Sequence, residues 1–245
     1  MNQLRIHLYA LCLNEERMLP FFFQHYENIV DRFFIFDNGS NDNSLEILRN
    51  HPKVDLKSIS FHGTSFVLSA LIFYNTCWKE SRNKADWVIV CNIDEHIHHE
   101  NLRTYLDECS EKGYTLIKPE GFEMVSKEFP KADQPLRQQI RRGVREIAFD
   151  KPQLFQPNSI KEINFLPGRH NAKPEGNIQL PPNSEVKLLH YKHLGYEYFI
   201  QRLSELREGL RENDRTRNFG RQYDWDEKQK IQHLQRLLEI SVDVV

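Results

Sequence analysis

The stretch Trp87–His96 reads WVIVCNIDEH. Its first five side chains are all apolar, a pattern typical of a central parallel strand that is buried on both faces. The run then turns polar at Asn92, Asp94 and Glu95. In open α/β sheets, ligands bind beyond the carboxyl ends of the strands. This stretch therefore predicts an α/β protein whose chemistry follows its central strand.

Apolar runs and amphipathic stretches alternate on the amino-terminal side of this strand. We expect strands at 4–13, 32–37 and 54–61, and helices at 15–30, from 44 onward and at 65–80. Asn14 is the expected N-cap of the first helix, with Glu15 and Glu16 favouring its positive end. Alternation of this kind indicates βαβ units and a mainly parallel sheet.

The carboxyl-terminal half is less regular. We expect strands at 114–118 and 185–191, and helices at 100–112, 196–213 and 224–240. Prolines and glycines interrupt residues 121–182, a segment too long for a bare loop, so it should hold short strands and a binding surface. The simplest division is one α/β domain over residues 1–195, with the helices of residues 196–245 packed on it.

Composition and charge exclude several classes of protein. The 245 residues suffice for one large domain, and the net charge of -2 gives no basic field for nucleic acid. No apolar run reaches the roughly 18 residues that span a bilayer. The start of the chain lacks a small-residue cleavage site, which indicates a buried strand rather than a signal peptide. The four cysteines lack CxxC spacing, which indicates reduced thiols in a cytoplasmic protein.

Polar clusters follow three of the predicted strands. They are Asn14-Glu15, Asp37–Ser40 and Asn92–His96. Each alone is typical of a turn, but together they mark one edge of the sheet. The second cluster fails as a calcium loop because Leu48 stands where a bidentate glutamate is needed. The chain also contains neither G-x-G-x-x-G nor a Walker A motif.

The third cluster carries the most chemistry. A carboxylate held by a rigid sheet, as Asp94 would be, suits a hard divalent cation that bridges two phosphates. His96 and His98 alternate onto one face, so a zinc site is an alternative, but no cysteine or nearby fourth ligand completes it. A solvated loop is the expected setting of His98 and His99.

With these motifs in order, the chain resembles a known family. The succession strand–Asn-Glu, strand–DNGSND and strand–x-Asp-Glu is similar to that of family 2 glycosyltransferases with the GT-A fold. The late segment Leu188–Lys192 (LLHYK) and the run Lys151–Gly176 resemble a bacterial subgroup whose metal motif ends in Asp-Glu. The resemblance covers residues 4–200. It implies a mixed, mainly parallel sheet flanked by helices, with a helical extension at the carboxyl end.

The resemblance implies a role for each matching residue. It places Asn14 and Glu15 beside the nucleotide, Asp37 on the base, most often uracil, and Ser40 nearby. The first carboxylate of the family's metal motif is replaced by Asn92, which can still bond a ribose hydroxyl but adds no charge. Metal affinity is therefore expected to be lower than with the full motif.

The metal side of the site is implied in the same way. Asp94 would ligate Mn²⁺ or Mg²⁺, His190 would approach the ion and the diphosphate from the other side, and Lys192 would neutralise charge. A metal-binding imidazole must be neutral, so activity should fall as His190 protonates below about 6.5, its ordinary pKa. His170 would contact the acceptor or the diphosphate, and a packed structural histidine is an equal alternative.

The implied reaction moves a sugar from a nucleotide-diphosphate donor, most often a UDP-sugar, to a saccharide or lipid-linked acceptor in cell-surface polysaccharide synthesis. The resemblance implies inversion, with a carboxylate base for the acceptor hydroxyl. Glu120, Glu123 and Asp133 follow the fifth strand. Glu123 is favoured among them because desolvation by its apolar neighbours in GFEM would raise its pKa, and a solvated loop glutamate is the alternative. The expected setting is cytoplasmic, with at most peripheral contact at the inner membrane face.

Two rival functions stay open. A sugar nucleotidyltransferase would carry a glycine-rich basic loop after the first strand, where this chain has LNEERML. A degenerate fold that binds a nucleotide-sugar without catalysis is the second rival, and Asn92 favours it. The arginines of residues 196–221 are interleaved with glutamates, as in a solvated, salt-bridged helix, and contact with anionic lipid is the alternative.

Overall fold

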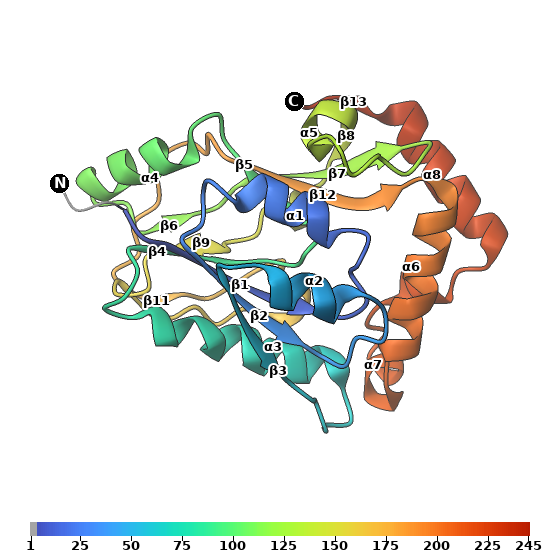
Figure 1. The fold of residues 1–245 in the computed structure, drawn as a ribbon, viewed down its shortest axis with the longest axis horizontal. Coiled ribbons are helices and arrows are strands. Elements are labelled where there is room, and N and C mark those ends of the chain that lie inside the picture. Colours follow the sequence, from blue (N-terminus) through green and yellow to red (C-terminus); the bar gives the residue numbers. More distant parts are fainter. Residues whose placement is uncertain (1–3) are drawn as a thin grey trace.

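The stretch that decides the fold forms strand β4, which lies inside a six-stranded sheet in the computed structural model of residues 4–245 (Figure 1). The sheet has the order β3-β2-β1-β4-β9-β6. Strands β1 to β4 run parallel to one another, and β9 is antiparallel to both β4 and β6. The bounds are β1 Ile6–Cys12, β2 Arg32–Asp37, β3 Val54–Ser58, β4 Trp87–Val90, β6 Leu116–Ile117 and β9 Leu154–Phe155. Every residue of β4 is buried, as its apolar sequence predicts.

Helices cover both faces of this sheet. One core contains side chains of α1, α2 and α4, and a second core on the opposite face contains those of α3 and η1. The bounds are α1 Leu19–Tyr26, α2 Ser44–Asn50, α3 Phe66–Thr76, η1 Cys77–Ser81 and α4 Leu102–Glu111. A mixed, mainly parallel sheet between helical layers confirms the expected GT-A fold class.

A second, five-stranded sheet has the order β13-β8-β7-β12-β5. The chain enters it directly after β4, because β5 is the next strand. Strand β12 pairs antiparallel with β5 and parallel with β7, and the Tyr191 N–H donates to the carbonyl of Asp94 at 2.8 Å. The bounds are β5 Glu95–His98, β7 Glu120–Ser126, β8 Arg142–Arg145, β12 Lys187–Leu194 and β13 Val242–Asp243. The end of the central strand is thereby fastened to a strand far along the chain.

The carboxyl-terminal helices pack on the second sheet. Phe199 and Leu203 of α6, with Leu234 and Leu237 of α8, enclose Val125 of β7. Figure 1 shows α6 and α8 together at one end of the molecule. The bounds are α6 Tyr196–Gly209, α7 Glu212–Thr216, η4 Arg221–Asp224 and α8 Glu227–Ile240. The division of the chain at residue 195 stays a prediction.

Helix α7 also contacts α3, one of the helices that cover the first sheet. The buried Asp214 carboxylate accepts from the Ser65 hydroxyl at 2.5 Å and from the Phe66 N–H at 2.8 Å, at the amino end of α3. Negative charge is favoured at that end of a helix. The remaining short elements are α5 Leu136–Gln139, η2 Ile147–Phe149, η3 Pro167–Arg169, β10 Ile160–Glu162 and β11 Glu175–Gly176.

Two local expectations are wrong. Helix α1 begins at Leu19 rather than at residue 15, because Asn14 has a left-handed backbone (φ 53°) and its side chain accepts from the Asn41 N–H. Asn14 is therefore no N-cap, while Pro20 stands in the first turn, where its missing N–H costs nothing. His98 lies in β5 with its side chain 11% exposed, so it is not in a solvated loop.

The four cysteines form no disulfide. All four cysteines are free, and Cys12, Cys91 and Cys109 are buried. Within residues 4–245, no helix is both long and apolar enough to cross a membrane. The first three residues, part of the start that is predicted to be a strand rather than a signal peptide, lie outside the described residues.

His25 is expected to make the fold sensitive to mild acid. Its ring stacks on His96 with centroids 4.5 Å apart, and its Nε2 donates to the carbonyl of Ile97 at 2.8 Å. Burial lowers the pKa of His25 to about 4, whereas the unfolded chain takes up this proton near pH 6.5. Between these values the unfolded state binds more protons, so this contribution to stability is complete above about pH 6.5 and is lost as the pH falls toward 4.

Thermal unfolding at a series of pH values between about 7.5 and 4.5 checks this expectation. The His25→Gln variant keeps a side-chain N–H but does not titrate, so its melting temperature should fall less over that range. Equal losses in the variant and the unchanged chain would contradict the assignment.

Candidate active site

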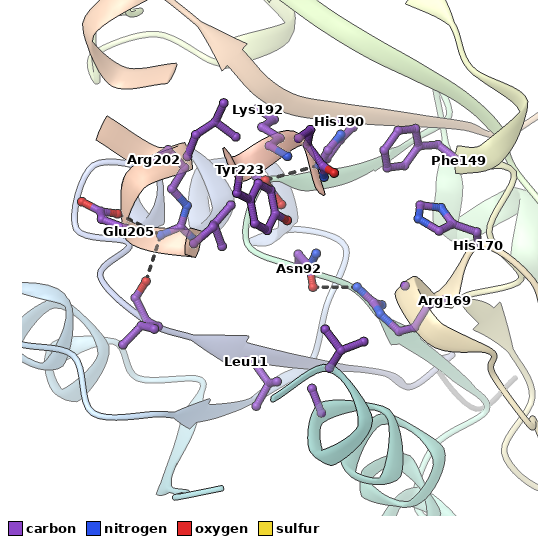
Figure 2. A pocket seen from close by; sticks show the side chains of 18 of the residues that line it. Leu11, Asn92, Phe149, Arg169, His170, His190, Lys192, Arg202, Glu205 and Tyr223 are labelled. Atoms are coloured by element: carbon purple, nitrogen blue, oxygen red, sulfur yellow. Dashed lines mark hydrogen bonds and ion pairs between the residues drawn. The ribbon is translucent and has the colours of Figure 1, made fainter. Parts of the chain in front are cut away.

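A cavity of about 550 Å³ lies where the carboxyl ends of β1 and β4 meet the second sheet and the carboxyl-terminal helices. The end of β1, helix α3 and the loop after β4 form one part of its wall. Strands β7 and β12 form another part, and α6, η4 and α8 complete it. Figure 2 shows Asn92 and Arg169 on one side of this space and His190 and Lys192 on another.

Asp94, His190 and Glu123 form a connected row in the cavity wall. The Asp94 Oδ2 lies 3.3 Å from His190 Nε2, and the Glu123 Oε2 lies 3.0 Å from His190 Nδ1. The antiparallel pairing of β5 with β12 and the parallel pairing of β7 with β12 bring the three strands together. His190 stands in the middle of β12, not at its end as the sequence suggests.

The two carboxylates control the charge of His190. Burial alone would lower the pKa of His190, but Glu123 and Asp94 outweigh it and raise that pKa to about 9. Burial alone would raise the pKa of Asp94, but the facing imidazole of His190 outweighs it and brings that pKa below its ordinary value. Without a metal, the ring is therefore an imidazolium between two carboxylates at neutral pH.

Glu123 holds a second imidazole as well. Its Oε2 also lies 2.9 Å from His193 Nδ1. Burial raises the pKa of Glu123, but His190 and His193 outweigh it and bring that pKa well below the ordinary value. The expectation that apolar neighbours raise the pKa of Glu123 is wrong, because two histidines contact the carboxylate and their charge outweighs the effect of burial.

A buried ion cluster lies beside this row. Glu95 is fully buried, and its carboxylate lies 2.5 Å from the Lys151 ammonium and 3.2 Å from the Arg169 guanidinium. Burial would raise the pKa of Glu95, but Lys151 and Arg169 outweigh it and lower it. The Asn92 amide oxygen accepts from Arg169 at 2.6 Å and from the Tyr74 hydroxyl at 3.0 Å. Asn92 thus contributes to the cavity wall through an oxygen that protein groups already occupy.

The loop after β1 is held from the opposite side by α6. The Arg202 guanidinium pairs with Glu15 and donates to the carbonyl of Leu13 at 3.1 Å. Its side chain is 11% exposed, so the expectation that the arginines of this helix are solvated is wrong for Arg202. Both Glu15 and Arg202 line the cavity.

The residues expected around the nucleotide base form the back of a loop. The Asp37 carboxylate accepts from the Gly39 N–H at 2.9 Å and from the Ser40 N–H at 3.2 Å. The Ser40 hydroxyl accepts from the Asn14 N–H at 3.0 Å. Of this loop, Asn38 lines the main cavity, whereas Asp37, Ser40 and Asn14 do not. Asp37, Ser40 and Asn14 therefore hold the loop in shape through hydrogen bonds. Asn38 is the residue of this loop that lines the cavity.

Two further predicted residues line the cavity. The Lys192 ammonium lies 4.8 Å from the centre of the Tyr223 ring. Figure 2 shows the two side chains near each other. His170 lies near Phe149, with ring centres 5.4 Å apart, and its Nδ1 is 2.7 Å from the carbonyl oxygen of Ala148.

The family model of glycosyltransferase family 92 matches residues 13–232. The chain belongs to glycosyltransferase family 92. The resemblance to family 2 is therefore right about the class of enzyme, but the family that the chain matches is a different one. No curated protein matches the chain.

Several solved structures have a similar course of the chain. S. aureus TarS 1-349 is 13% identical, with a TM-score of 0.47, over 94% of this chain and 69% of that one. The same fragment in complex with UDP is 12% identical, with a TM-score of 0.46, over 96% and 71%. A 4-diphosphocytidyl-2C-methyl-D-erythritol synthase is 12% identical, with a TM-score of 0.36, over 63% and 76%. At TM-scores this low, the similarity to these structures carries no information about the candidate site.

The spacing of the Asp94 and His190 side chains is compatible with two adjacent ligands of a divalent ion. Among residues 4–245, no group of three or more histidine, cysteine, aspartate or glutamate side chains is placed to hold an ion alone. Adjacent ligands of an octahedral ion, each at about 2.1 Å, stand about 3 Å apart, close to the 3.3 Å between Asp94 Oδ2 and His190 Nε2. A metal-binding histidine usually donates its other ring N–H to a carboxylate or carbonyl. Glu123 is such a carboxylate for the Nδ1 of His190.

Several residues of the candidate site could not be predicted from the sequence. Arg169 and Lys151 lie in an irregular segment, and Arg202 stands among many arginines of a charged helix. His193 adjoins the late His-Tyr-Lys motif without belonging to it. The pairing of each with a carboxylate is a product of the fold, since the partners come from distant elements.

The other carboxylates considered for the base, Glu120 and Asp133, are exposed and do not line the cavity. His96, considered for zinc, is buried against His25 and Tyr191. Of these three carboxylates, Glu123 is the one that lines the cavity.

Proposed function

We propose that the chain transfers a sugar from a nucleotide-diphosphate donor, with uracil as the base, to a saccharide or lipid-linked acceptor, with inversion and with help from a divalent metal. The observation that carries the proposal is the Asp94–His190 pair, 3.3 Å apart in the wall of a large cavity at the carboxyl edge of the sheet. Membership of a glycosyltransferase family supports it. Cell-surface glycan synthesis and a cytoplasmic setting, with peripheral contact at the inner membrane face, belong to the same proposal.

The donor would run from the β1 side of the cavity to the second sheet. The loop that Asn14, Glu15, Asp37 and Ser40 support would carry the nucleoside, with Asn38 facing it. A diphosphate would reach the β5–β12 pair, where Mn²⁺ or Mg²⁺ would be held by Asp94 and His190. When bound, the ion supplies positive charge to the leaving diphosphate.

Cations in the cavity wall would stabilise the negative charge of the donor's diphosphate. Lys192 stands two residues after His190 in β12 and lines the cavity. Lys151 and Arg169 share a single buried carboxylate, so that cluster keeps an excess positive charge. Positive charge fixed in a water-poor wall stabilises charge that develops on a leaving group. His170 lines the same region and is a further candidate for contact with the diphosphate or the acceptor.

Glu123 is the proposed base. It is ionised at neutral pH, because its pKa lies below the ordinary range, and so it can accept a proton. Both recorded imidazole contacts go to its Oε2. Within residues 4–245, no side chain or backbone group hydrogen-bonds its Oε1, which would receive the proton of the acceptor hydroxyl.

Asn38 is expected to contact the nucleoside, and Asp37 to hold the loop. Asn38→Ala should weaken UDP binding about tenfold, the usual worth of a buried hydrogen bond to a ligand, with little change in melting temperature. Asp37→Ala should weaken UDP binding and also lower the melting temperature, because two backbone N–H groups lose their acceptor. Calorimetry and thermal unfolding measure both quantities. Unchanged UDP affinity in both variants would contradict this placement of the nucleoside.

A hydrolysis assay on UDP-sugars, with and without Mn²⁺, tests the proposed function. A transferase should release UDP slowly in the absence of acceptor and faster with Mn²⁺. Binding of the UDP-sugar without any release of UDP, with or without candidate acceptors, would instead support a degenerate, non-catalytic protein. The replacement of a metal-motif carboxylate by Asn92 favours that alternative. Consumption of pyrophosphate to give UTP would indicate a nucleotidyltransferase.

A further inference from the structure

Three partly exposed rings line the end of the cavity formed by the carboxyl-terminal helices. Tyr223 belongs to η4, Trp225 follows it, and His233 belongs to α8. We call these three residues the aromatic wall. The Trp225 and His233 ring centres are 4.9 Å apart, and Phe199 of α6 lies behind them, 6.3 Å from His233. The wall is therefore built on packed helices and presents flat apolar surface to the cavity.

The aromatic wall leads directly to the proposed base. His233 lies 5.2 Å from His193, ring centre to ring centre, and the Nδ1 of His193 lies 2.9 Å from Glu123 Oε2. The wall and the Asp94–His190 pair are thus linked to Glu123 through different histidines, the wall through His193 and the pair through His190 itself. A molecule resting on the wall would contact His233, whose ring neighbours the histidine that holds the proposed base.

Charge at the wall favours a neutral occupant. Asp224, between the two large aromatic residues in sequence, pairs with Arg207 at 2.8 Å. Glu205 pairs with Arg202 at 3.2 Å. Lys192 is a cation beside Tyr223; it comes from the same strand as His190 and serves the diphosphate in the proposed function. Pyranose rings present an apolar face of C–H groups, which aromatic side chains bury, and hydroxyls that a few polar groups orient.

We propose that the aromatic wall is the acceptor subsite and that it takes a neutral pyranoside. The inference rests on the proposed function, whose acceptor it locates. In the transfer, an acceptor hydroxyl oxygen forms the new bond to the anomeric carbon of the donor sugar. The bond from that carbon to the diphosphate breaks, its electron pair leaves with the nucleoside diphosphate, and the hydroxyl proton passes to Glu123.

Trp225 offers a direct readout. Of the three tryptophans, Trp78 and Trp87 are fully buried, so a change of emission on adding sugar reports Trp225. We expect saturable changes with methyl glycosides of neutral hexoses or with lactose, cellobiose or diacetylchitobiose. The experiment uses the full chain with UDP and Mn²⁺ present. The response should vanish in Trp225→Phe, while that variant still binds the same sugar by saturation-transfer NMR.

Truncation of the wall should weaken sugar binding alone. Tyr223→Ala and Trp225→Ala should each raise the dissociation constant of the best-binding sugar by about tenfold or more, as loss of an aromatic anchor does. In Trp225→Ala, the dissociation constants of UDP and UDP-glucose, measured by calorimetry, should stay unchanged and would also reveal a misfolded variant. Ile240→Ala, an exposed apolar residue at the end of α8, is the matched control and should change neither.

Each contrary outcome is distinct. Binding of UDP without a saturable response to any neutral sugar would overturn the acceptor subsite and leave the proposed function standing. Tighter binding of methyl glucuronoside than of methyl glucoside would overturn the neutral class. A loss of UDP-glucose binding but not of UDP binding in Trp225→Ala would make the wall a donor-sugar site. A sugar response without any UDP binding would support the saccharide site and overturn the nucleotide donor.

Discussion

Replacement of Glu123 by glutamine is expected to lower sugar transfer by about a hundredfold or more, the usual worth of a general base. The amide cannot accept the proton of the acceptor hydroxyl, yet it keeps the size of the side chain and one oxygen for the facing histidines. UDP-sugar binding should therefore change only a few-fold. Steady-state kinetics measure the loss in kcat, and calorimetry measures the binding.

Glu120 provides the matched control, since it is an exposed glutamate on the same strand and does not line the cavity. Glu120→Gln should transfer sugar at the unchanged rate. Near-normal turnover in Glu123→Gln would remove the role of base from Glu123. Asp133→Asn would then be the next variant to measure, although its exposure argues against it.

The second large effect concerns Asp94 and His190. Asp94→Ala and His190→Ala should each weaken Mn²⁺-dependent UDP binding by about a hundredfold, since each removes one of two protein ligands. Because both act through one ion, the double variant should lose little more than either single one. His99→Ala, a partly exposed histidine just beyond β5, is the control and should bind normally. Additive losses in the double variant would mean that the two side chains do not share an ion.

The pH dependence of this binding follows from the pKa of His190. The carboxylates of Glu123 and Asp94 raise that pKa to about 9 in the metal-free protein. The ring must lose its proton to ligate, so Mn²⁺ affinity should rise with pH up to about 9 and fall by up to tenfold for each unit below it. The sequence alone placed this fall near pH 6.5, because it could not reveal the two carboxylates.

The layered α/β fold could be predicted because its signals are local. The apolar run of β4 and the alternation of strands and helices before it depend only on neighbouring residues. The start of α1 could not be predicted, because the left-handed backbone of Asn14 is fixed by contacts with Ser40 and Asn41 in a different loop.

The candidate site was predictable in part for the same reason. Asp94 follows a strand whose apolar sequence marks it as central, and polar residues at such a place are informative. His190 came from a resemblance, since nothing local separates it from the neighbouring His193. The partners Arg169 and Arg202 reach Glu95 and Glu15 across the fold, and no local pattern encodes such pairs.

The central claim is that Asp94 and His190 hold one metal-diphosphate site between them. A crystal structure of the chain with UDP and Mn²⁺, with the ion located by its anomalous scattering, tests it most directly. We predict an ion that has the Asp94 carboxylate and the His190 Nε2 within about 2.0–2.4 Å and takes its other ligands from the diphosphate and water. An ion bound elsewhere, or either side chain turned toward the core or the solvent, would contradict it.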